Sequence, residues 1–200
     1  MQQALEEEVS DHRLVNRIRG GDSAAFEALF RRYYEALCGF VEARIGESSN
    51  SEDLVQNIFL NLWRRRKDLD PETTVKTYLF GAARNESIDY RKHRKVRNDW
   101  EEEERNAQSS VETVPGPARQ ISGPVESAEQ RQLRAELQKG VQDLPSRRRE
   151  VYVLSRRHGL TYEEIAAVMD ISPKTVDNQM VEALKALRKR LQGYVSVQEF

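Results

Sequence analysis

The sequence predicts an all-α protein that consists of two small helical domains. Apolar residues recur at three- and four-residue spacing along most of the chain, and the alternating pattern of β-strands is nearly absent. A segment rich in proline and glycine separates two such periodic regions, which is typical of a linker. We therefore expect a first domain over 10–95, a flexible linker over 96–127 and a second domain over 128–195.

Composition excludes several classes of protein. Hydrophobic residues make up 38% and charged residues 32% of the 200 residues, which is ordinary for a globular protein. Apolar runs are too short for a transmembrane helix, and the acidic amino terminus does not fit a secretory signal. Cys38 is the single cysteine, so an intrachain disulfide is impossible, and we expect it to be a small buried residue. We expect a cytoplasmic protein without membrane insertion.

Charge is distributed unevenly along the chain, although the formal net charge is −1. Residues 84–97 carry six Lys or Arg against two acidic residues, and residues 128–195 carry thirteen against nine, a net charge of +4 in each segment. Between them, residues 99–105 carry five acidic residues and one Arg. The two basic segments indicate two places that could meet a polyanion, with solvated helix faces as the alternative.

Helix signals divide the first domain into four helices. Capping residues and helix-terminating glycines predict the first helix between Ser10 and Gly20, the second from Asp22 or Ser23 to about Gly46, the third from Ser51 and the fourth from about Val75 to about His93. A polar loop is expected before the fourth helix, because Pro71 disfavours helical conformation at the residue before it.

The second domain contains the pattern of a helix-turn-helix. We expect helices at about 128–142, 145–157, 161–169 and 173–190, the last two forming the motif. Thr161 and Glu164 fit a capping box, Asp170 tolerates a left-handed turn, and Ser172 can cap the last helix. The predicted outer face of that helix suits hydrogen bonding in a major groove and comprises Lys174, Thr175, Asn178, Gln179, Glu182 and Lys185. A generic helical hairpin is the alternative for this segment.

The first domain has two further faces of interest. The third helix carries a polar face that suits a protein groove, formed by Asp53, Gln56, Asn57, Asn61 and Arg64. The fourth helix ends in a basic cluster around Tyr90, and aromatic residues beside cations suit stacking on unpaired bases and neutralising phosphates. A core helix with a solvated basic tail is the alternative.

Three stretches of the chain, in their order and spacing, resemble the extracytoplasmic-function (ECF) group of RNA polymerase sigma factors. They are SEDLVQNIFLNLWRRR, TYLFGAARNESIDYRKHR and LPSRRREVYVLSRRHGLTYEEIAAVMDISPKTVDNQMVEALKALRKR. The resemblance implies a sigma region 2 helical bundle, a flexible linker and a sigma region 4 helix-turn-helix. It also implies an alternative sigma factor that binds core RNA polymerase and promoter DNA, directs initiation, and is held by an anti-sigma factor.

The resemblance assigns residues to each interface. Docking on core polymerase implicates Asp53, Gln56, Asn57 and Arg64. Capture of the melted minus-ten element implicates Asp68, Asp70, Thr73, Thr74, Tyr78, Arg84, Asn85, Asp89, Arg91 and Lys92. Reading of the minus-thirty-five element implicates Arg156, Arg157, Ser172, Lys174, Thr175, Asn178, Gln179 and Lys185. The loop at 68–74 is more acidic than a loop that faces DNA is expected to be, which leaves its base preference open.

Three other classes of protein compete with this hypothesis, and one of them, a scaffold or anti-sigma partner, does not fit an intact recognition helix. The sequence does not support an enzyme, because His12, His93 and His158 lack metal-ligand spacing and no phosphate-binding loop or nucleophile motif occurs. We therefore expect neither a metal nor a cofactor. A conventional helix-turn-helix regulator would share the motif, but it would bind duplex DNA without core polymerase and usually as a dimer.

Overall fold

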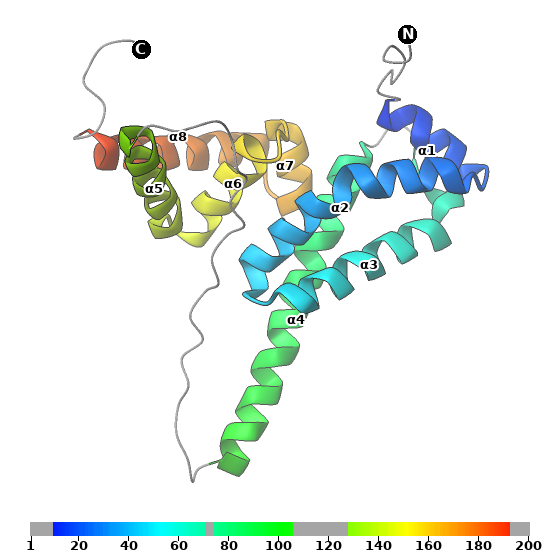
Figure 1. The fold of residues 1–200 in the computed structure, drawn as a ribbon, viewed down its shortest axis with the longest axis horizontal. Coiled ribbons are helices and arrows are strands. Elements are labelled where there is room, and N and C mark those ends of the chain that lie inside the picture. Colours follow the sequence, from blue (N-terminus) through cyan, green and yellow to red (C-terminus); the bar gives the residue numbers. More distant parts are fainter. Residues whose placement is uncertain (1–9, 71–73, 106–127, 193–200) are drawn as a thin grey trace. The chain divides into compact units, whose positions relative to one another are not determined.

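The computed structural model describes residues 10–70, 74–105 and 128–192, and within these ranges every regular element is a helix, as predicted. The described helices fall into two compact units. The first contains α1 (Asp11–Arg19), α2 (Ser23–Ile45), α3 (Ser48–Arg64), the 3-10 helix η1 (Arg66–Asp68) and α4 (Val75–Arg105), and the second contains α5 (Ala128–Asp143), α6 (Ser146–Arg156), α7 (Tyr162–Met169) and α8 (Pro173–Leu191) (Figure 1).

The helix ends of the first unit confirm the predicted caps at Ser10, Asp22 and Gly46. The predicted start of the third helix at Ser51 is wrong, because α3 begins at Ser48 and the buried Ser51 hydroxyl donates to the Ser48 carbonyl oxygen at 2.6 Å. The Ser10 hydroxyl accepts a hydrogen bond from the Arg13 amide, and the Asp22 carboxylate accepts bonds of 2.9 and 3.1 Å from the amides of Ala24 and Ala25. Donation from the Ala25 amide, followed by that from Arg17, lowers the pKa of Asp22. At the other end of α2, Gly46 adopts a φ of 79°, a left-handed conformation that glycine accepts without strain.

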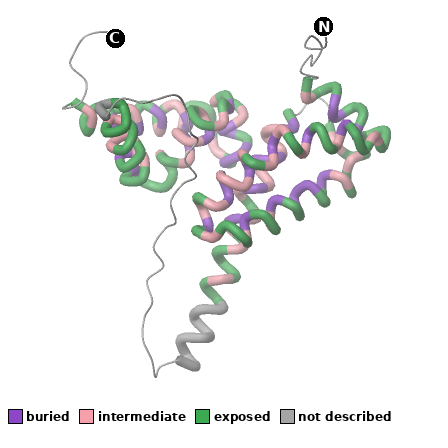
Figure 2. The backbone as a smooth tube through the Cα atoms, viewed as in Figure 1, coloured by how far each residue is buried: buried purple, intermediate pink, exposed green. Residues whose placement is uncertain are grey.

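The core of the first unit forms around α2, which packs against α1, α3 and α4. Leu37 and Val41 of α2 are fully buried, and edge-to-face contacts join Phe26 to Phe59 and Phe40 to Phe80, with ring centroids 6.1 and 5.3 Å apart. Figure 2 shows that buried residues line the inner sides of these helices. Cys38 is half-buried rather than buried as expected, and burial still raises the pKa of its thiol.

The structure differs from the prediction most clearly at α4. This helix was expected to end near His93, but it continues to Arg105, so residues 96–105 of the predicted linker are helical. Arginine and glutamate, which are good helix formers, make up six of the ten residues of this stretch, and neither glycine nor proline interrupts the sequence between Gly81 and Pro115. The rest of the predicted linker, 106–127, lies outside the described residues. Figure 1 shows α4 extending beyond the other helices of its unit.

In the second unit, α8 is the central helix and contacts α5, α6 and α7. Its buried side comprises Val176, Met180, Ala183 and Leu187. Gly140 of α5 is buried against α8, and a Cβ atom there would lie 2.9 Å from Leu187 Cδ2 and 3.0 Å from Arg190 Cδ. The absence of a side chain at Gly140 therefore permits the close approach of α5 and α8.

Candidate nucleic-acid interface

Three adjacent caps fix the geometry of the helix-turn-helix formed by α7 and α8. The Glu164 amide donates to the Thr161 hydroxyl at 3.2 Å, and the Thr161 amide donates to the Glu164 carboxylate at 2.8 Å, which completes the predicted capping box. Asp170 adopts φ 54° and ψ 54°, the predicted left-handed conformation. The Ser172 hydroxyl then accepts from the Thr175 amide at 3.1 Å, so the turn is three residues long and α8 begins at a fixed angle.

The outer face of α8 carries part of the predicted DNA-reading set. Lys174, Asn178 and Lys185 are exposed on the side of the helix opposite its buried stripe, and Ser172 is exposed at its start. Thr175 and Gln179 are half-buried, because they lie toward the flank of the helix, and the Thr175 hydroxyl bonds with that of Ser172 at 2.8 Å. Lys174 Nζ lies 3.1 Å from the Asp177 carboxylate, so an acidic residue accompanies this cation.

Arg156 and Arg157 lie at the carboxyl end of α6, and both are exposed. Because α6 packs against both helices of the motif, these guanidinium groups belong to the same unit as α8. Arginine side chains in such positions suit phosphate contacts, which orient a recognition helix without specifying sequence.

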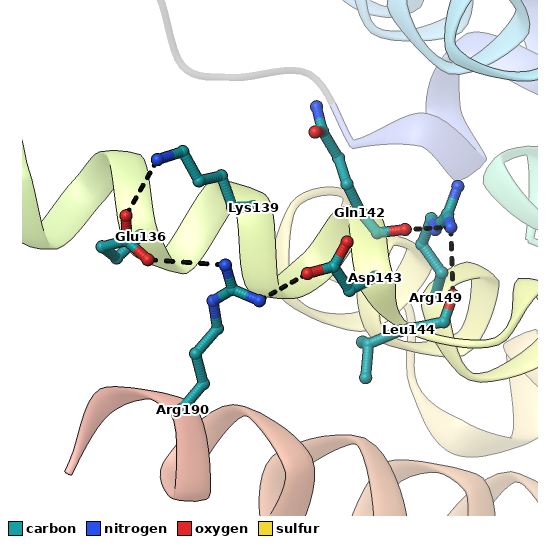
Figure 3. A network of polar contacts seen from close by, with 7 residues as sticks. All are labelled: Glu136, Lys139, Gln142, Asp143, Leu144, Arg149 and Arg190. Atoms are coloured by element: carbon teal, nitrogen blue, oxygen red, sulfur yellow. Dashed lines mark hydrogen bonds and ion pairs between the residues drawn. The ribbon is translucent and has the colours of Figure 1, made fainter.

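Arg190, near the end of α8, forms ion pairs with side chains of the protein itself. Its guanidinium lies between the carboxylates of Glu136 and Asp143 on α5, as Figure 3 shows, and it contacts Glu136 at 3.5 Å. Lys139 first and Arg190 second lower the pKa of Glu136. In the same region the Arg149 guanidinium donates to the carbonyl oxygens of Gln142 and Leu144 at the end of α5. These contacts fasten α5 to α8 and α6.

Six of the ten residues predicted to meet the minus-ten element lie on α4, and four of these six are exposed. Asn85, Asp89, Arg91 and Lys92 are exposed, whereas Tyr78 and Arg84 are half-buried. Lys92 Nζ lies 3.3 Å from the Asp89 carboxylate, one turn away. Four of these six residues are therefore accessible on the surface of α4.

An open hollow lies beside the loop that precedes α4. It has a volume of about 470 Å³ and is lined by Val15, Arg65, Asp68, Leu69, Asp70, Val75 and Tyr78. Three predicted residues, Asp68, Asp70 and Tyr78, thus come together there. Thr74 lies at the start of α4, where its hydroxyl bonds with that of Thr77 at 2.6 Å. Thr73 lies outside the described residues.

The predicted docking face of α3 is exposed along its length. Asp53, Gln56, Asn57 and Arg64 are all exposed, and Leu60 among them is 49% exposed. Sequence analysis missed Leu60, and it missed Val181 on α8, which is 55% exposed. The heptad interval was the available signal, because each lies seven residues after a predicted site residue, Asp53 or Lys174, and so on the same face of its helix.

Other kinds of site find no support in the described ranges. No helix there is both long and apolar enough to cross a bilayer. The described side chains also form no group of three or more His, Cys, Asp or Glu that could hold a metal ion.

Comparison with known proteins identifies the class to which these two units belong. Residues 29–97 match the family described as Sigma-70 region 2, and residues 134–187 match Sigma-70, region 4. RNA polymerase sigma factor NccH of Alcaligenes xylosoxydans xylosoxydans is 30% identical over 189 residues, which cover 92% of this chain and 95% of NccH. The ECF RNA polymerase sigma-E factor of Escherichia coli (strain K12) is 29% identical over 191 residues, which cover 96% and 99%.

Two solved structures share the fold. CnrH, in complex with the cytosolic domain of CnrY, aligns with a TM-score of 0.61 and 23% identity over 92% of this chain and 97% of that one. The sigma factor RpoE of Bartonella quintana, in complex with the anti-sigma factor NepR, aligns with a TM-score of 0.60 and 22% identity over 84% and 96%.

The chain therefore belongs to the sigma-70 family, within its ECF group. It is an alternative sigma factor that directs transcription. Members of this family are initiation factors rather than enzymes, which agrees with the sequence-based expectation.

Proposed function

We propose that the two units recognise the promoter in two different forms of DNA, while α3 docks on core RNA polymerase. In this proposal α8 reads the duplex minus-thirty-five element, and α4 with the hollow before it holds the melted minus-ten element. The observation that carries it is the exposed stripe of α8, where Lys174, Asn178 and Lys185 lie opposite a fully apolar buried stripe.

Duplex reading by α8 follows from its side chains and its position. An asparagine can pair with an adenine edge in the major groove, and lysines can reach guanine acceptors or phosphates. The exposed Ser172 end of α8 presents the amino terminus of a helix, which favours a phosphate. Arg156 and Arg157 are proposed to contact phosphates and so to orient α8, and Thr175 and Gln179 to contribute from its flank.

Single-stranded DNA is the proposed ligand of the first unit. Extruding a base from the stack costs on the order of a few kcal/mol, and contacts between the extruded base and a pocket that fits it can offset this cost. Arg65 and Tyr78 at the hollow offer planar groups for stacking, and the exposed Arg91 and Lys92 offer charge for the backbone. Binding only the melted form would shift the promoter toward opening, because a ligand moves an equilibrium by its differential affinity.

Docking on core polymerase is assigned to α3 and to Asp53, Gln56, Asn57 and Arg64. A partner surface would cover the exposed Leu60 at the centre of this face. Core polymerase would then hold both units near their promoter elements, which raises the effective concentration of each. Such an assembly would act in the cytoplasm.

An anti-sigma factor is the second proposed protein partner. The solved complexes of CnrH with CnrY and of RpoE with NepR support this proposal for a chain of the same fold. Such a partner would withhold the chain from core polymerase until a signal releases it.

Transcription in vitro tests the proposal. The full chain is added to bacterial core polymerase on a library of promoter fragments, with Asp53→Ala and Asn178→Ala variants in parallel. Transcripts that depend on the chain are expected, with loss of polymerase binding for Asp53→Ala and altered upstream preference for Asn178→Ala. Tight duplex binding without polymerase, and no transcripts with it, would instead indicate a conventional regulator.

A further inference from the structure

Val181 is an apolar residue in the middle of the exposed stripe of α8. It is 55% exposed, and it lies one helical turn after Asn178, two turns after Lys174 and one turn before Lys185. The buried stripe of α8 lies on the opposite side of the helix, so Val181 adds little to the core. Valine is also a weaker helix former than lysine, glutamate or alanine, so helix stability does not explain it.

The lengths of the side chains along this stripe suit the shape of a DNA groove. Long cationic side chains, Lys174 and Lys185, lie at its two ends, and the two short side chains, Asn178 and Val181, lie at its centre. Short side chains reach a base only where the helix backbone lies deep in the groove, whereas lysines can extend to the phosphates on its walls. The centre of the stripe is therefore the part suited to base edges.

Only one group on the base edges of the major groove is apolar, the 5-methyl group of thymine. We propose that Val181 packs against the 5-methyl group of a thymine in the duplex element read by α8, and so specifies thymine at that position. This inference rests on the proposed role of α8. Val181 lies about 4.5 Å further along the helix axis than Asn178. The thymine is therefore placed within one or two base pairs of the base that Asn178 contacts.

Replacing single thymines by deoxyuridine tests this contact, because the substitution removes the methyl group and leaves every hydrogen-bonding group in place. The full chain is assembled with core polymerase, and a promoter is taken from the library experiment. Each thymine of its upstream element is then replaced in turn, and open-complex formation is measured. Removing the critical methyl group is expected to lower open-complex formation by the wild-type complex about three- to fivefold, as for the loss of one buried methyl contact.

The Val181→Ala variant identifies the residue that makes the contact. On the thymine promoter it is expected to lose the same three- to fivefold, and deoxyuridine at the critical position is then expected to cause no further loss. Val96→Ala on α4 is the matched control, since Val96 is also 55% exposed. This control is expected to keep the full deoxyuridine effect. Alanine is a good helix former, so both variants are expected to fold, which circular dichroism checks.

Two results would overturn the inference alone: an upstream element in which no thymine methyl matters, or a Val181→Ala variant that keeps the wild-type sensitivity at every position. A separate result would overturn the proposed role of α8 and the inference with it. In that case Lys174→Ala and Asn178→Ala would also leave promoter selection unchanged.

Discussion

The hydroxyl of Tyr90 donates a hydrogen bond of 2.6 Å to the carboxylate of Glu47, 43 positions earlier in the chain. Arg94, one turn further along α4, lies 2.7 Å from the second oxygen of the same carboxylate and 3.1 Å from the carbonyl oxygen of Ile45. The corner between α2 and α3 therefore holds α4 near the last turn that contacts the bundle. Arg91, Lys92 and Lys95, which neighbour this attachment in the sequence, remain exposed.

Replacing Glu47 with glutamine is expected to destabilise the first unit. The variant keeps an acceptor for Tyr90 but loses the charge that pairs with Arg94. The Glu47 side chain is 35% exposed, so after discounting for solvent screening we expect a loss of about 1 kcal/mol in the free energy of unfolding. Urea unfolding followed by tryptophan fluorescence measures it, because Trp63 and Trp100 both belong to the first unit.

The same contact predicts a pH dependence. Hydrogen bonds from Tyr90 and then Arg94 lower the pKa of Glu47 below its ordinary value of 4.5. A lowered pKa in the folded state means that the stabilisation is fully present above pH 4.5 and is lost as the pH falls through the folded value. The difference in stability between wild type and Glu47→Gln should therefore shrink below pH 4.5.

A matched control separates this pair from surface charge in general. Glu27 pairs with Arg31 on α2, but these side chains are 61% and 78% exposed. The Glu27→Gln variant is expected to change the free energy of unfolding by less than about 0.5 kcal/mol. Equal effects of the two variants would contradict the role assigned to Glu47.

Two glycines within helices predict opposite effects of the same substitution. Gly140→Ala should destabilise the α5–α8 packing by about 1 kcal/mol, because the strain against buried Leu187 and against Arg190 exceeds the gain in helix propensity. Gly81→Ala on α4 should instead stabilise by about 0.5–1 kcal/mol, because the added Cβ would meet no atom within 4 Å apart from its chain neighbours and the backbone of its own helix. Thermal unfolding and hydrogen exchange resolved by segment compare the two, and stabilisation by both variants would contradict the packing argument.

The positions of the helices could largely be predicted because local signals determine them. Ser10, Asp22, Thr161 and Ser172 each provide a side-chain acceptor for a backbone amide that the helix leaves without a partner, so the starting residues are visible in the sequence. The end of α4 was missed because no such signal exists there. The acidic run contributed to the linker prediction, although the same glutamates and the flanking arginines favour a helix.

The candidate sites were less predictable because they depend on contacts between distant segments. Spacing could place Lys174, Asn178 and Lys185 on one face, but the attachment of Tyr90 and Arg94 to Glu47 joins residues more than 40 positions apart. Sequence analysis also assigned no role to Arg190. The contacts of Arg190 with α5 show that basic residues divide into those that bind within the protein and those that remain exposed.

The turn of the helix-turn-helix offers a third stability test. Asp170 is the one described non-glycine residue with a positive φ. This left-handed conformation is unfavourable for a residue that carries a Cβ atom, but it is not unfavourable for glycine. Asp170→Gly is expected to stabilise the second unit by about 0.5 kcal/mol, and Asp170→Val to destabilise it by more than about 1 kcal/mol. Thermal unfolding checks the order glycine, aspartate, valine, and any other order contradicts the strain argument.

Asp177 is the basis of the last prediction, which concerns the strength of DNA binding. Its carboxylate lies 3.1 Å from Lys174 Nζ on the exposed part of α8, so it neutralises a cation that is proposed to meet DNA. Asp177→Asn should free Lys174 for a phosphate. The polymerase complex of this variant is then expected to bind the upstream duplex more tightly at low salt.

The dependence on salt distinguishes a new phosphate contact from a general change in charge. A phosphate neutralised by one more cation steepens the slope of log affinity against log salt by about one unit. Glu35→Gln makes the same change of charge at an exposed position of α2, and it should leave the slope unaltered. Because the gain comes from counterion release, it should also be nearly independent of DNA sequence. A tighter but sequence-selective variant with an unchanged slope would mean that Asp177 itself contacts a base, as a carboxylate can with the amino group of cytosine.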